Sequence, residues 1–350
     1  MAIDILFLDV GQGDASLIFL PTGGVIAFDC KDAHVLLKTL DSRDIRRLDA
    51  LVLSHLDLDH VGGVPALLTA IEVKTIFVNR DRDISPTAPR AKKARKLVAR
   101  VTDGDRRGTF RVEAATERAT PIAEGDGWSV HLAAPRHATS ALQPALDGRE
   151  LEPNRHSVVL RVQVGDQARV LIGADAPLAS WAQVRALSAE VFRVPHHGGA
   201  IDDGGIPPTW DVSRLYREVG ADVTVISVGS NNRFNHPAVD WIRPLTGGAC
   251  TLMCTQVTPR CHPDVNEGGG IRGGLARSSV GREGFVEPLW RHYRDPANVA
   301  GAKATREVPC AGTVVVHLAA GGPPRVLPSA AAHGAVVESW DAPLCRPPVT

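Results

Sequence analysis

Short apolar runs separated by turn residues dominate the first sixty residues of the chain. The run from Ile3 to Val10 is broken by Gly11-Gln12-Gly13-Asp14, and two further runs flank the turn Pro21-Thr22-Gly23-Gly24. Apolar runs of this length between Gly and Pro predict strands joined by tight turns. A further apolar run, Leu48–Leu53, predicts a buried strand that leads directly into a polar segment.

Beyond residue 60, strand-like and helix-like patterns alternate. A hairpin is expected around Gly165-Asp166, and Pro237 is expected to start a helix. The strands predicted here are 73–79, 128–133, 157–164, 168–172, 191–194, 222–228 and 313–318, and the helices predicted along the chain are 34–40, 64–70, 88–101, 178–187 and 237–245. Many strands with interspersed helices favour an α/β protein in which helices cover layered sheets.

Composition narrows this picture but does not change it. The chain has 350 residues and is 44% hydrophobic, which is the composition of a globular protein. Its 39 basic and 39 acidic residues give a formal net charge of zero, so the overall charge does not indicate binding of nucleic acid. We expect no membrane span, because no apolar stretch approaches about 18 residues, and no signal peptide, because Asp4 and Asp9 interrupt the first apolar run. A reduced, cytoplasmic protein is therefore expected.

The segment after the fourth predicted strand carries the most informative chemistry. His55, Asp57, Asp59 and His60 are four potential ligands within six residues, followed by Gly62-Gly63. Carboxylates this close repel one another, and a divalent cation would remove that cost. Imidazole and carboxylate together suit Zn²⁺, Mn²⁺ or Fe²⁺. The alternative is a solvated acidic loop.

Three later turns carry similar residues, each after a predicted strand. They are Gly173-Ala174-Asp175, Val194-Pro195-His196-His197-Gly198-Gly199 and Asn235-His236-Pro237. Sheet-based enzymes assemble their sites from such loops. A single His in such a loop is usually structural, but an ordered series of four favours a metal site.

Three motifs, in this order along the chain, resemble the metallo-β-lactamase superfamily: His55-x-Asp57-x-Asp59-His60-x-Gly62-Gly63, Gly173-x-Asp175 and His196-His197-Gly198. Four further motifs resemble, more narrowly, the cytoplasmic metallohydrolase domain of the competence protein ComEC and its stand-alone relatives. They are Leu8-Asp9-Val10-Gly11-Gln12-Gly13-Asp14, Asn154-x-x-Ser157-Val158-Val159-Leu160, Ser227-Val228-Gly229 and Asn235-His236-Pro237. The resemblance implies a four-layer αβ/βα sandwich with a dinuclear metal site along one edge.

By this resemblance, His55 and Asp57 would hold one metal, and Asp59 and His60 the other. Asp175 would bridge the two metals, and either His196 or His197 would complete the second site. Both alternatives for that last ligand stay open from the sequence.

Two departures from the commonest superfamily pattern affect the choice of metal. Asp57 stands where the pattern has His, and Asn154 stands where a His ligand usually precedes the bridging Asp. His156 could substitute as a ligand, although a structural or surface role is favoured. The oxygen-rich first site shifts the preference toward Mn²⁺ over Zn²⁺.

The chemistry expected of such a site is metal-dependent hydrolysis of a phosphodiester. Two metals about 3.5–4 Å apart can share a hydroxide and stabilise both oxygens of an in-line displacement. Asp59 would orient this hydroxide, and His236 would contact the phosphate or protonate the leaving group. Asp14 would support a metal-binding His, unless the turn that contains it is purely conformational.

The substrate prediction rests on local charge. Residues 80–111 contain eleven Arg or Lys and four Asp, a net charge of +7. Five of these cations lie on the predicted helix 88–101 and would bind nucleic acid: Lys92, Lys93, Arg95, Lys96 and Arg100. We therefore expect a nuclease acting on DNA. The alternatives are hydrolysis of a small ester, lactone or phosphoester, and a non-catalytic module that binds nucleic acid or a protein partner.

The carboxy-terminal region contains most of the thiols. Cys254, Cys261, Cys310 and Cys345, with His262 beside Cys261, predict a structural zinc site, and the alternative is buried hydrophobic cysteines. The predicted organisation is a hydrolase domain over 1–262 with a basic insertion at about 80–111, a Gly- and Arg-rich loop over 263–309, and a carboxy-terminal strand with a Cys-containing extension over 310–350 that packs on the hydrolase.

Overall fold

The computed structural model describes most of the chain. The described residues are 2–79, 89–136, 153–201, 210–230, 232–246, 250–258, 260–261, 309–338 and 343–345. The predicted Gly- and Arg-rich loop, apart from Pro309, and His262 lie outside these residues.

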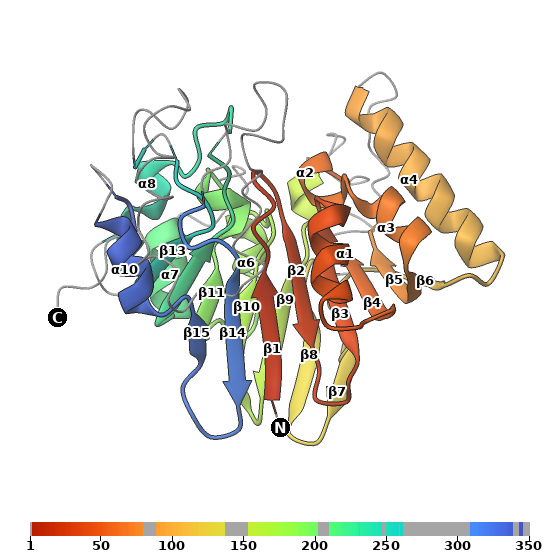
Figure 1. Cartoon of the computed structure of the whole chain (residues 1–350), viewed down its shortest axis with the longest axis horizontal. Helices are drawn as coiled ribbons and strands as arrows, with labels where there is room; N and C mark the ends of the chain where they lie inside the picture. Colours follow the sequence, from red (N-terminus) through yellow and green to blue (C-terminus); the bar gives the residue numbers. More distant parts are fainter. Residues whose placement is uncertain are drawn as a thin grey trace.

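Among the described residues, eight strands form a first mixed sheet (Figure 1). In sheet order the strands are β15 (Arg325–Leu327), β14 (Val314–Ala319), β1 (Ala2–Phe7), β2 (Ala15–Phe19), β3 (Val25–Cys30), β4 (Arg47–Leu53), β5 (Glu72–Val78) and β6 (Arg111–Glu113). The first three strands of the chain form an antiparallel meander, and pairing is parallel from β3 to β6. Strand β14 pairs with β1, so residues from the carboxy-terminal part of the chain complete the sheet that the first residues begin.

Seven described strands form the second sheet. In sheet order they are β13 (Thr251–Cys254), β12 (Val223–Ile226), β11 (Val191–Arg193), β10 (Gln167–Ile172), β9 (Val159–Val164), β8 (Trp128–Ala134) and β7 (Ala123–Gly125). The predicted hairpin around Gly165 is present as the antiparallel pair of β9 and β10. Strands β10 to β13 run parallel.

Helices cover the outer face of each sheet, and three hydrophobic layers hold the four structural layers together. The helices are α1 (Ala33–Asp41), α2 (Leu58–Val61), α3 (Val64–Ala70), α4 (Pro89–Arg106), α6 (Leu178–Trp181), α7 (Val212–Val219), α8 (Val239–Ile242) and α10 (Ala330–Val337), with short 3₁₀ turns η1 (Pro153–His156), η2 (Pro195–Gly198) and η3 (Arg243–Leu245). Ile5, Val52 and Ile172 lie between the two sheets. The predicted four-layer αβ/βα sandwich is therefore confirmed.

The basic helix α4 connects β5 to β6. Its buried residues Ala94, Leu97 and Val101 follow helical spacing and pack in the same layer as α1 and α3. No described helix is both long enough and apolar enough to cross a membrane.

Two predicted helices are shorter than their sequence patterns indicate. Helix α6 ends at Trp181, whose buried indole N–H donates to the Ala176 carbonyl oxygen. Helix α8 ends at Ile242, and a 3₁₀ turn follows, because Pro244 has no amide proton to continue the helical hydrogen bonds.

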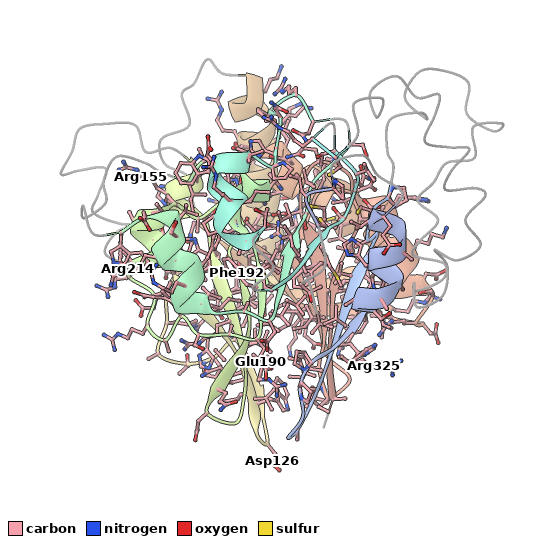
Figure 2. The ribbon with its side chains drawn as sticks, turned by 90° about the vertical axis from the view of Figure 1, so that its left-hand side faces the viewer. Asp126, Arg155, Glu190, Phe192, Arg214 and Arg325 are labelled. Carbon is pink, nitrogen blue, oxygen red and sulfur yellow. The ribbon has the colours of Figure 1, made fainter. Side chains whose placement is uncertain are left out.

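The two sheets end in loops at the edge that includes η1. Figure 2 shows Asp126, in the β7–β8 turn, at the end of the molecule opposite Arg155, which lies in η1. The segments that follow β4, β10 and β11 lie at the η1 end, and they carry the predicted ligand motifs. Parallel strands place their carboxyl ends at one edge, which is why motifs far apart in the chain meet there.

Candidate active site

The predicted motif 55–60 lies between β4 and α2. His55 follows the end of β4, and Asp57 is the N-cap residue of α2, which carries Asp59 and His60. Both imidazoles are buried, whereas Asp57 and Asp59 are partly exposed and line a pocket. The short helix therefore holds two imidazoles in the protein and turns two carboxylates toward solvent.

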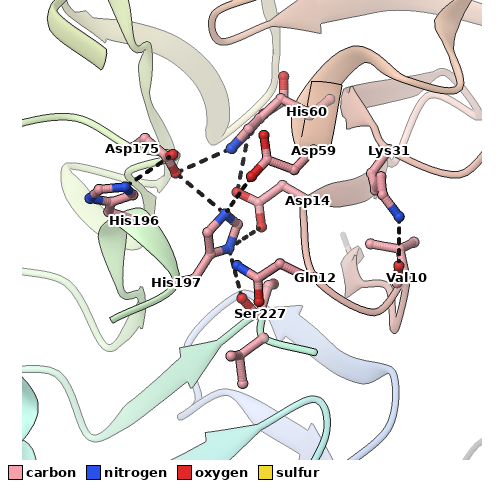
Figure 3. Close-up of polar contacts among 12 residues, drawn as sticks. Val10, Gln12, Asp14, Lys31, Asp59, His60, Asp175, His196, His197 and Ser227 are labelled. Carbon is pink, nitrogen blue, oxygen red and sulfur yellow. Dashed lines mark hydrogen bonds and ion pairs between the residues drawn. The ribbon is translucent and has the colours of Figure 1, made fainter. Parts of the chain in front are cut away.

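Asp175 lies at the centre of the site, and its two carboxylate oxygens face different groups of residues (Figure 3). Oδ2 lies 3.8 Å from His55 Nε2 and 3.9 Å from His196 Nε2. Oδ1 lies 3.2 Å from His60 Nε2 and 3.8 Å from His197 Nε2. The carboxylate thus stands between two clusters of imidazoles.

The aspartates of the 55–60 segment complete these two clusters. Asp57 Oδ2 lies 3.9 Å from His55 Nε2, and Asp59 Oδ2 lies 3.7 Å from His197 Nε2. The first cluster therefore contains His55, Asp57 and His196, and the second contains Asp59, His60 and His197. Sequence alone left open which of the two adjacent histidines belongs to the site, and the structure places each beside a different oxygen of Asp175.

The backbone between β11 and Gly199 is unusual. His196 and His197 both have left-handed backbone conformations, with φ of 52° and 53°. Such conformations cost about 1–3 kcal/mol per non-glycine residue and concentrate at functional sites. Here they turn two consecutive imidazoles toward the same carboxylate, which a regular strand or helix cannot do.

Hydrogen bonds fix which nitrogen of each imidazole faces the centre. His197 Nδ1 donates to the Ser227 carbonyl oxygen at 2.8 Å, and His196 Nδ1 donates to the Ala200 carbonyl oxygen at 2.5 Å. The Nε2 atom of each ring is thereby left to face Asp175. Metal-binding histidines are oriented in this way.

Asp29, Ser54 and Ser157 also support the imidazoles, and the sequence interpretation did not single them out as site residues. Asp29 Oδ2 accepts from His60 Nδ1 at 2.8 Å, and Asp29 also accepts from the Ser54 backbone N–H and hydroxyl. Ser157 Oγ lies 3.1 Å from His55 Nδ1 and accepts from the Asp175 backbone N–H. A buried Asp at the end of an apolar strand was the available signal for Asp29.

Asp14 lies beneath the second cluster and is fully buried. Its carboxylate pairs with the buried guanidinium of Arg193 and lies 3.5 Å from His60 Nδ1 and 3.6 Å from His197 Nδ1. Burial lowers the pKa of Arg193 to about 9, which still leaves the guanidinium charged at neutral pH. Arg193 is a further residue that the sequence interpretation missed, although an Arg within the apolar run Val191–Val194 was the signal for it.

The turn that carries Asp14 also requires glycine at position 13. Gly13 has φ of +135°, and a Cβ atom there would lie 2.3 Å from the Asp59 carbonyl oxygen. The Asp14 N–H donates to that same oxygen at 2.8 Å. The turn therefore has a specific conformation, and it places Asp14 beside His60 and His197; support of a metal-binding His by Asp14 stays a prediction.

The pKa values at the site reflect a balance between burial and charge. Burial lowers the pKa of His55 to about 4, so this imidazole is neutral at pH 7. Burial also acts to lower the pKa of His60, but the charges of Asp175 and Asp29 outweigh it and raise that pKa well above its usual range. For Asp59, burial acts upward, but the contact with His197 and the charge of His60 bring the pKa below its usual range. The carboxylates of Asp29, Asp59 and Asp175 therefore favour a positively charged group beside them.

The central atoms of the site have the character of metal ligands. Among the described residues, the buried Nε2 atoms of His55, His60 and His197, together with Asp175 Oδ1, make no hydrogen bond of regular geometry. Ligand atoms of Asp14, His60, Asp175 and His197 all lie within 4.8 Å of one another. Leaving several buried polar atoms unpaired is costly, and a divalent cation would satisfy them together. These imidazole and carboxylate atoms therefore fit the divalent metal ions that the sequence motifs imply.

A pocket of about 630 Å³ opens over these atoms. Besides the carboxylates, it is lined by Gln12, Asn154, Arg233, Phe234 and His236. The Arg233 guanidinium lies 4.9 Å from the centre of the Phe234 ring, and both side chains are exposed. Neither residue was predicted for the site. The rim of the pocket thus combines a cation with an exposed aromatic ring.

His236 lines the same pocket next to Gly199. Its Nδ1–H donates to the His196 carbonyl oxygen at 3.0 Å, and burial together with the neighbouring histidines lowers its pKa to about 4. A Cβ atom on Gly199 would lie 2.3 Å from the His236 ring, so only glycine allows this approach. His236 is therefore a neutral imidazole at pH 7.

The remaining predicted residues lie farther from the centre. His156 is buried, and its carbonyl oxygen accepts a hydrogen bond from Asn79 Nδ2 at 3.1 Å. Among the described residues, His156 belongs to no cluster of side chains that could hold a metal ion. Lys92, Lys93, Arg95, Lys96 and Arg100 are exposed on α4, which rises at the same end of the molecule as α2 (Figure 1). The four predicted cysteines lie apart from the pocket.

The chain is similar in sequence to a known protein family and to one known protein. The family model of the metallo-beta-lactamase superfamily matches residues 9–142. The chain is 23% identical over 258 residues to ComE operon protein 3 of Bacillus subtilis, a match that covers 67% of this chain and 29% of that protein. The chain therefore spans less than a third of this relative.

Solved structures similar to this chain include three with 14% identity. A metal-dependent hydrolase of the beta-lactamase superfamily has a TM-score of 0.42, with coverage of 72% of this chain and 95% of the other. A metallo hydrolase from Ignicoccus hospitalis has a TM-score of 0.41, with coverage of 74% of this chain and 96% of the other. The short form of human tRNase Z has a TM-score of 0.37, with coverage of 63% of this chain and 91% of the other. The family model identifies residues 9–142 as part of a domain of the metallo-beta-lactamase superfamily.

Proposed function

We propose that this chain is a metal-dependent phosphodiester hydrolase that cleaves DNA. The observation that carries the proposal is the set of buried imidazole and carboxylate atoms without regular hydrogen bonds at the floor of the 630 Å³ pocket. An open pocket above a preformed metal-ligand set is the arrangement of a catalytic site rather than a structural one.

Two metal positions follow from the two sides of Asp175. His55, Asp57 and His196 would hold one divalent ion with Asp175 Oδ2. Asp59, His60 and His197 would hold the other with Asp175 Oδ1. Three carboxylates make the set rich in oxygen, which favours Mn²⁺ over Zn²⁺.

The chemistry needs no nucleophilic side chain. Two divalent ions would lower the pKa of water and neutralise charge on the phosphate. Asp59 faces the pocket and stays ionised at neutral pH, so its carboxylate can orient the attacking water by accepting a hydrogen bond.

His236 would bind the phosphate from the other side of the pocket. Its Nδ1–H is held by the His196 carbonyl oxygen, so Nε2 remains for the substrate. A phosphate anion beside the ring raises the pKa of His236, and the protonated Nε2 then donates to a phosphate oxygen. Proton uptake by His236 therefore accompanies substrate binding.

Charge and aromatic character around the pocket support a nucleic-acid substrate. Arg233 lies at the rim and offers a cation for a phosphate, and the exposed Phe234 ring can stack on a base. Exposed Lys92, Lys93 and Lys96 on α4 extend the cationic surface at the same end of the molecule. The resemblance to the hydrolase domain of the competence protein ComEC favours DNA over RNA in this proposal.

We also place the protein in the cytoplasm. All six cysteines are buried and free. Free thiols in this number are typical of a reducing compartment.

Cleavage assays on the full chain test the proposal. The substrates are single-stranded DNA, double-stranded DNA, RNA and a small lactone or ester, each with Mn²⁺, with Zn²⁺ or with chelator. Cleavage of DNA that requires metal is expected, with Mn²⁺ more effective than Zn²⁺. Cleavage of RNA alone, or of the small ester alone, would contradict the substrate assignment.

The variants His55→Ala and Asp175→Ala separate the site from a contaminating nuclease. Both should lose metal-dependent cleavage. Asp126→Asn removes a carboxylate at the opposite end of the molecule and is the matched control. Equal activity in all three variants would sink the assignment of the site.

A further inference from the structure

Four metal-binding side chains meet far from the catalytic pocket. Cys254 ends β13, Cys310 precedes β14, His333 lies on α10, and Cys345 belongs to the short described segment at the carboxy terminus. All four are at least 98% buried. They come from four separate segments of the chain, so only the tertiary structure brings them together.

Backbone hydrogen bonds fix the first two of these residues side by side. The Cys310 N–H donates to the Thr255 carbonyl oxygen, and the Ala311 N–H donates to the Cys254 carbonyl oxygen, both at 2.9 Å. An isolated bridge between Gln256 and Pro309 extends this pairing. Cys254 and Cys310 are thus presented by a rigid frame, which a preformed metal site requires.

The side-chain atoms lie close to the distances that a tetrahedral metal imposes. Cys345 Sγ lies 3.1 Å from Cys254 Sγ, and Cys310 Sγ lies 3.3 Å from His333 Nε2. The ligand atoms of Cys310, His333 and Cys345 all lie within 4.8 Å of one another. Zinc bonds of about 2.3 Å to sulfur and 2.0–2.1 Å to nitrogen place tetrahedral ligands about 3.5–3.8 Å apart.

We propose that Cys254, Cys310, His333 and Cys345 bind a structural Zn²⁺. This site is independent of the proposed catalytic metals and shares no residue with them. Four protein ligands would close the coordination sphere, and burial of all four excludes substrate, so the ion would have no catalytic role. Cys261, which the sequence also offers as a ligand, is buried, and its Sγ lies 3.7 Å from Thr258 Oγ1. The proposed set leaves Cys261 out because four ligands already fill a tetrahedral coordination sphere.

The site would fasten the carboxy-terminal elements to the second sheet. Helix α10 has only small or aliphatic residues besides His333, and Val337, one turn later, packs in the same hydrophobic layer as α7. The segment 343–345 has no regular secondary structure. Coordination by His333 and Cys345 would attach both elements to the frame that holds Cys254 and Cys310.

Sulfur coordination distinguishes this site from the catalytic one, which contains no cysteine. X-ray absorption at the zinc edge of the full chain should detect zinc bound by three sulfurs and one nitrogen. Cobalt substitution should give a thiolate-to-cobalt charge-transfer band. Both measurements use the wild-type protein, so they do not depend on whether a variant folds.

Variants then assign the ligands. Cys310→Ser and His333→Ala should each reduce sulfur-bound metal from about one equivalent per chain to near zero. Cys250→Ser is the matched control, because Cys250 is buried in the same hydrophobic layer and contacts Thr224 instead. The control should keep its metal.

Three results would overturn the proposal. The first is wild-type protein without sulfur-bound metal when purified with zinc under reducing conditions. The second is a sulfur-only coordination shell, which would remove His333 from the ligand set. The third is a disulfide between Cys254 and Cys345 in protein kept under reducing conditions. None of these results bears on DNA cleavage, so the two proposals fail separately.

Discussion

The Asp–His group at the pocket and the cysteine cluster on the second sheet both gather metal-binding side chains, but they differ in access and in chemistry. The first opens into a pocket of about 630 Å³ and offers imidazoles and carboxylates. The second is closed, with its three thiols and one imidazole buried. Open positions and hard ligands suit catalysis, whereas closed, soft ligand sets suit structural zinc.

The two regions also differ in how the chain supports them. The Asp–His group depends on left-handed residues and on buried partners such as Asp29 and Arg193. The cysteine cluster is held by ordinary backbone pairing next to β13. Removal of a ligand should therefore affect mainly activity in the first region and mainly stability in the second.

Loss of Asp175 should have the largest effect. Asp175→Ala removes the carboxylate that both clusters share, so kcat/KM for DNA cleavage should fall by about 10³-fold or more. Sulfur-bound metal should stay at the wild-type amount. Steady-state kinetics and metal analysis on the same preparation check both statements, and parallel loss of activity and sulfur-bound metal would erase the distinction between the regions.

Arg193 tests the buried framework of the first region. Arg193→Met leaves Asp14 buried without its cation, which should lower the free energy of unfolding by about 3–5 kcal/mol. Replacing both partners, Arg193→Met with Asp14→Asn, should recover most of that loss. Urea denaturation of the three proteins measures it, and a double variant as unstable as the single one would show that the pair does not act as a unit.

Cys310 tests the second region. Cys310→Ser should lower the melting temperature by about 5–10 °C through loss of the metal and loosening of α10. DNA cleavage measured well below the transition should fall less than 10-fold. Scanning calorimetry and kinetics distinguish these effects, with Cys250→Ser as the control. A melting temperature equal to that of the control would contradict a structural role.

The cationic surface should have the smallest effect. Replacing Lys92, Lys93 and Lys96 by Gln should weaken DNA binding by about 10-fold at moderate salt and reduce the salt dependence of the affinity. The pocket and its metals should be unaffected, so kcat should be unchanged. Fluorescence anisotropy over a range of salt concentrations tests this, with Lys38→Gln and Lys74→Gln on other elements as controls.

Much of the fold could be predicted from the sequence, because most strands and helices have local signals. The meander of the first three strands, the β9–β10 hairpin and helix α4 follow from apolar spacing and turn residues. The errors were local too: α6 ends early at Trp181, and Pro244 ends α8. The carboxy-terminal strand was predicted, but its pairing with β1 could not be, because register between distant strands has no local signal.

The sequence by itself determined the ligand chemistry where ligands cluster along the chain. His55, Asp57, Asp59 and His60 occupy six positions, and a single strand-to-helix turn must bring them close together. Motifs after other strands were recognisable because parallel strands end at one edge.

Only the tertiary structure decided which partners complete each site. Asp29, Arg193 and His333 are single polar residues in ordinary apolar surroundings, and their roles depend on contacts with residues 23 or more positions away. It also placed His196 and His197 on different oxygens of Asp175 through two left-handed residues. Local spacing fixes which side chains lie near one another along a strand or helix, but long-range packing fixes what each one faces.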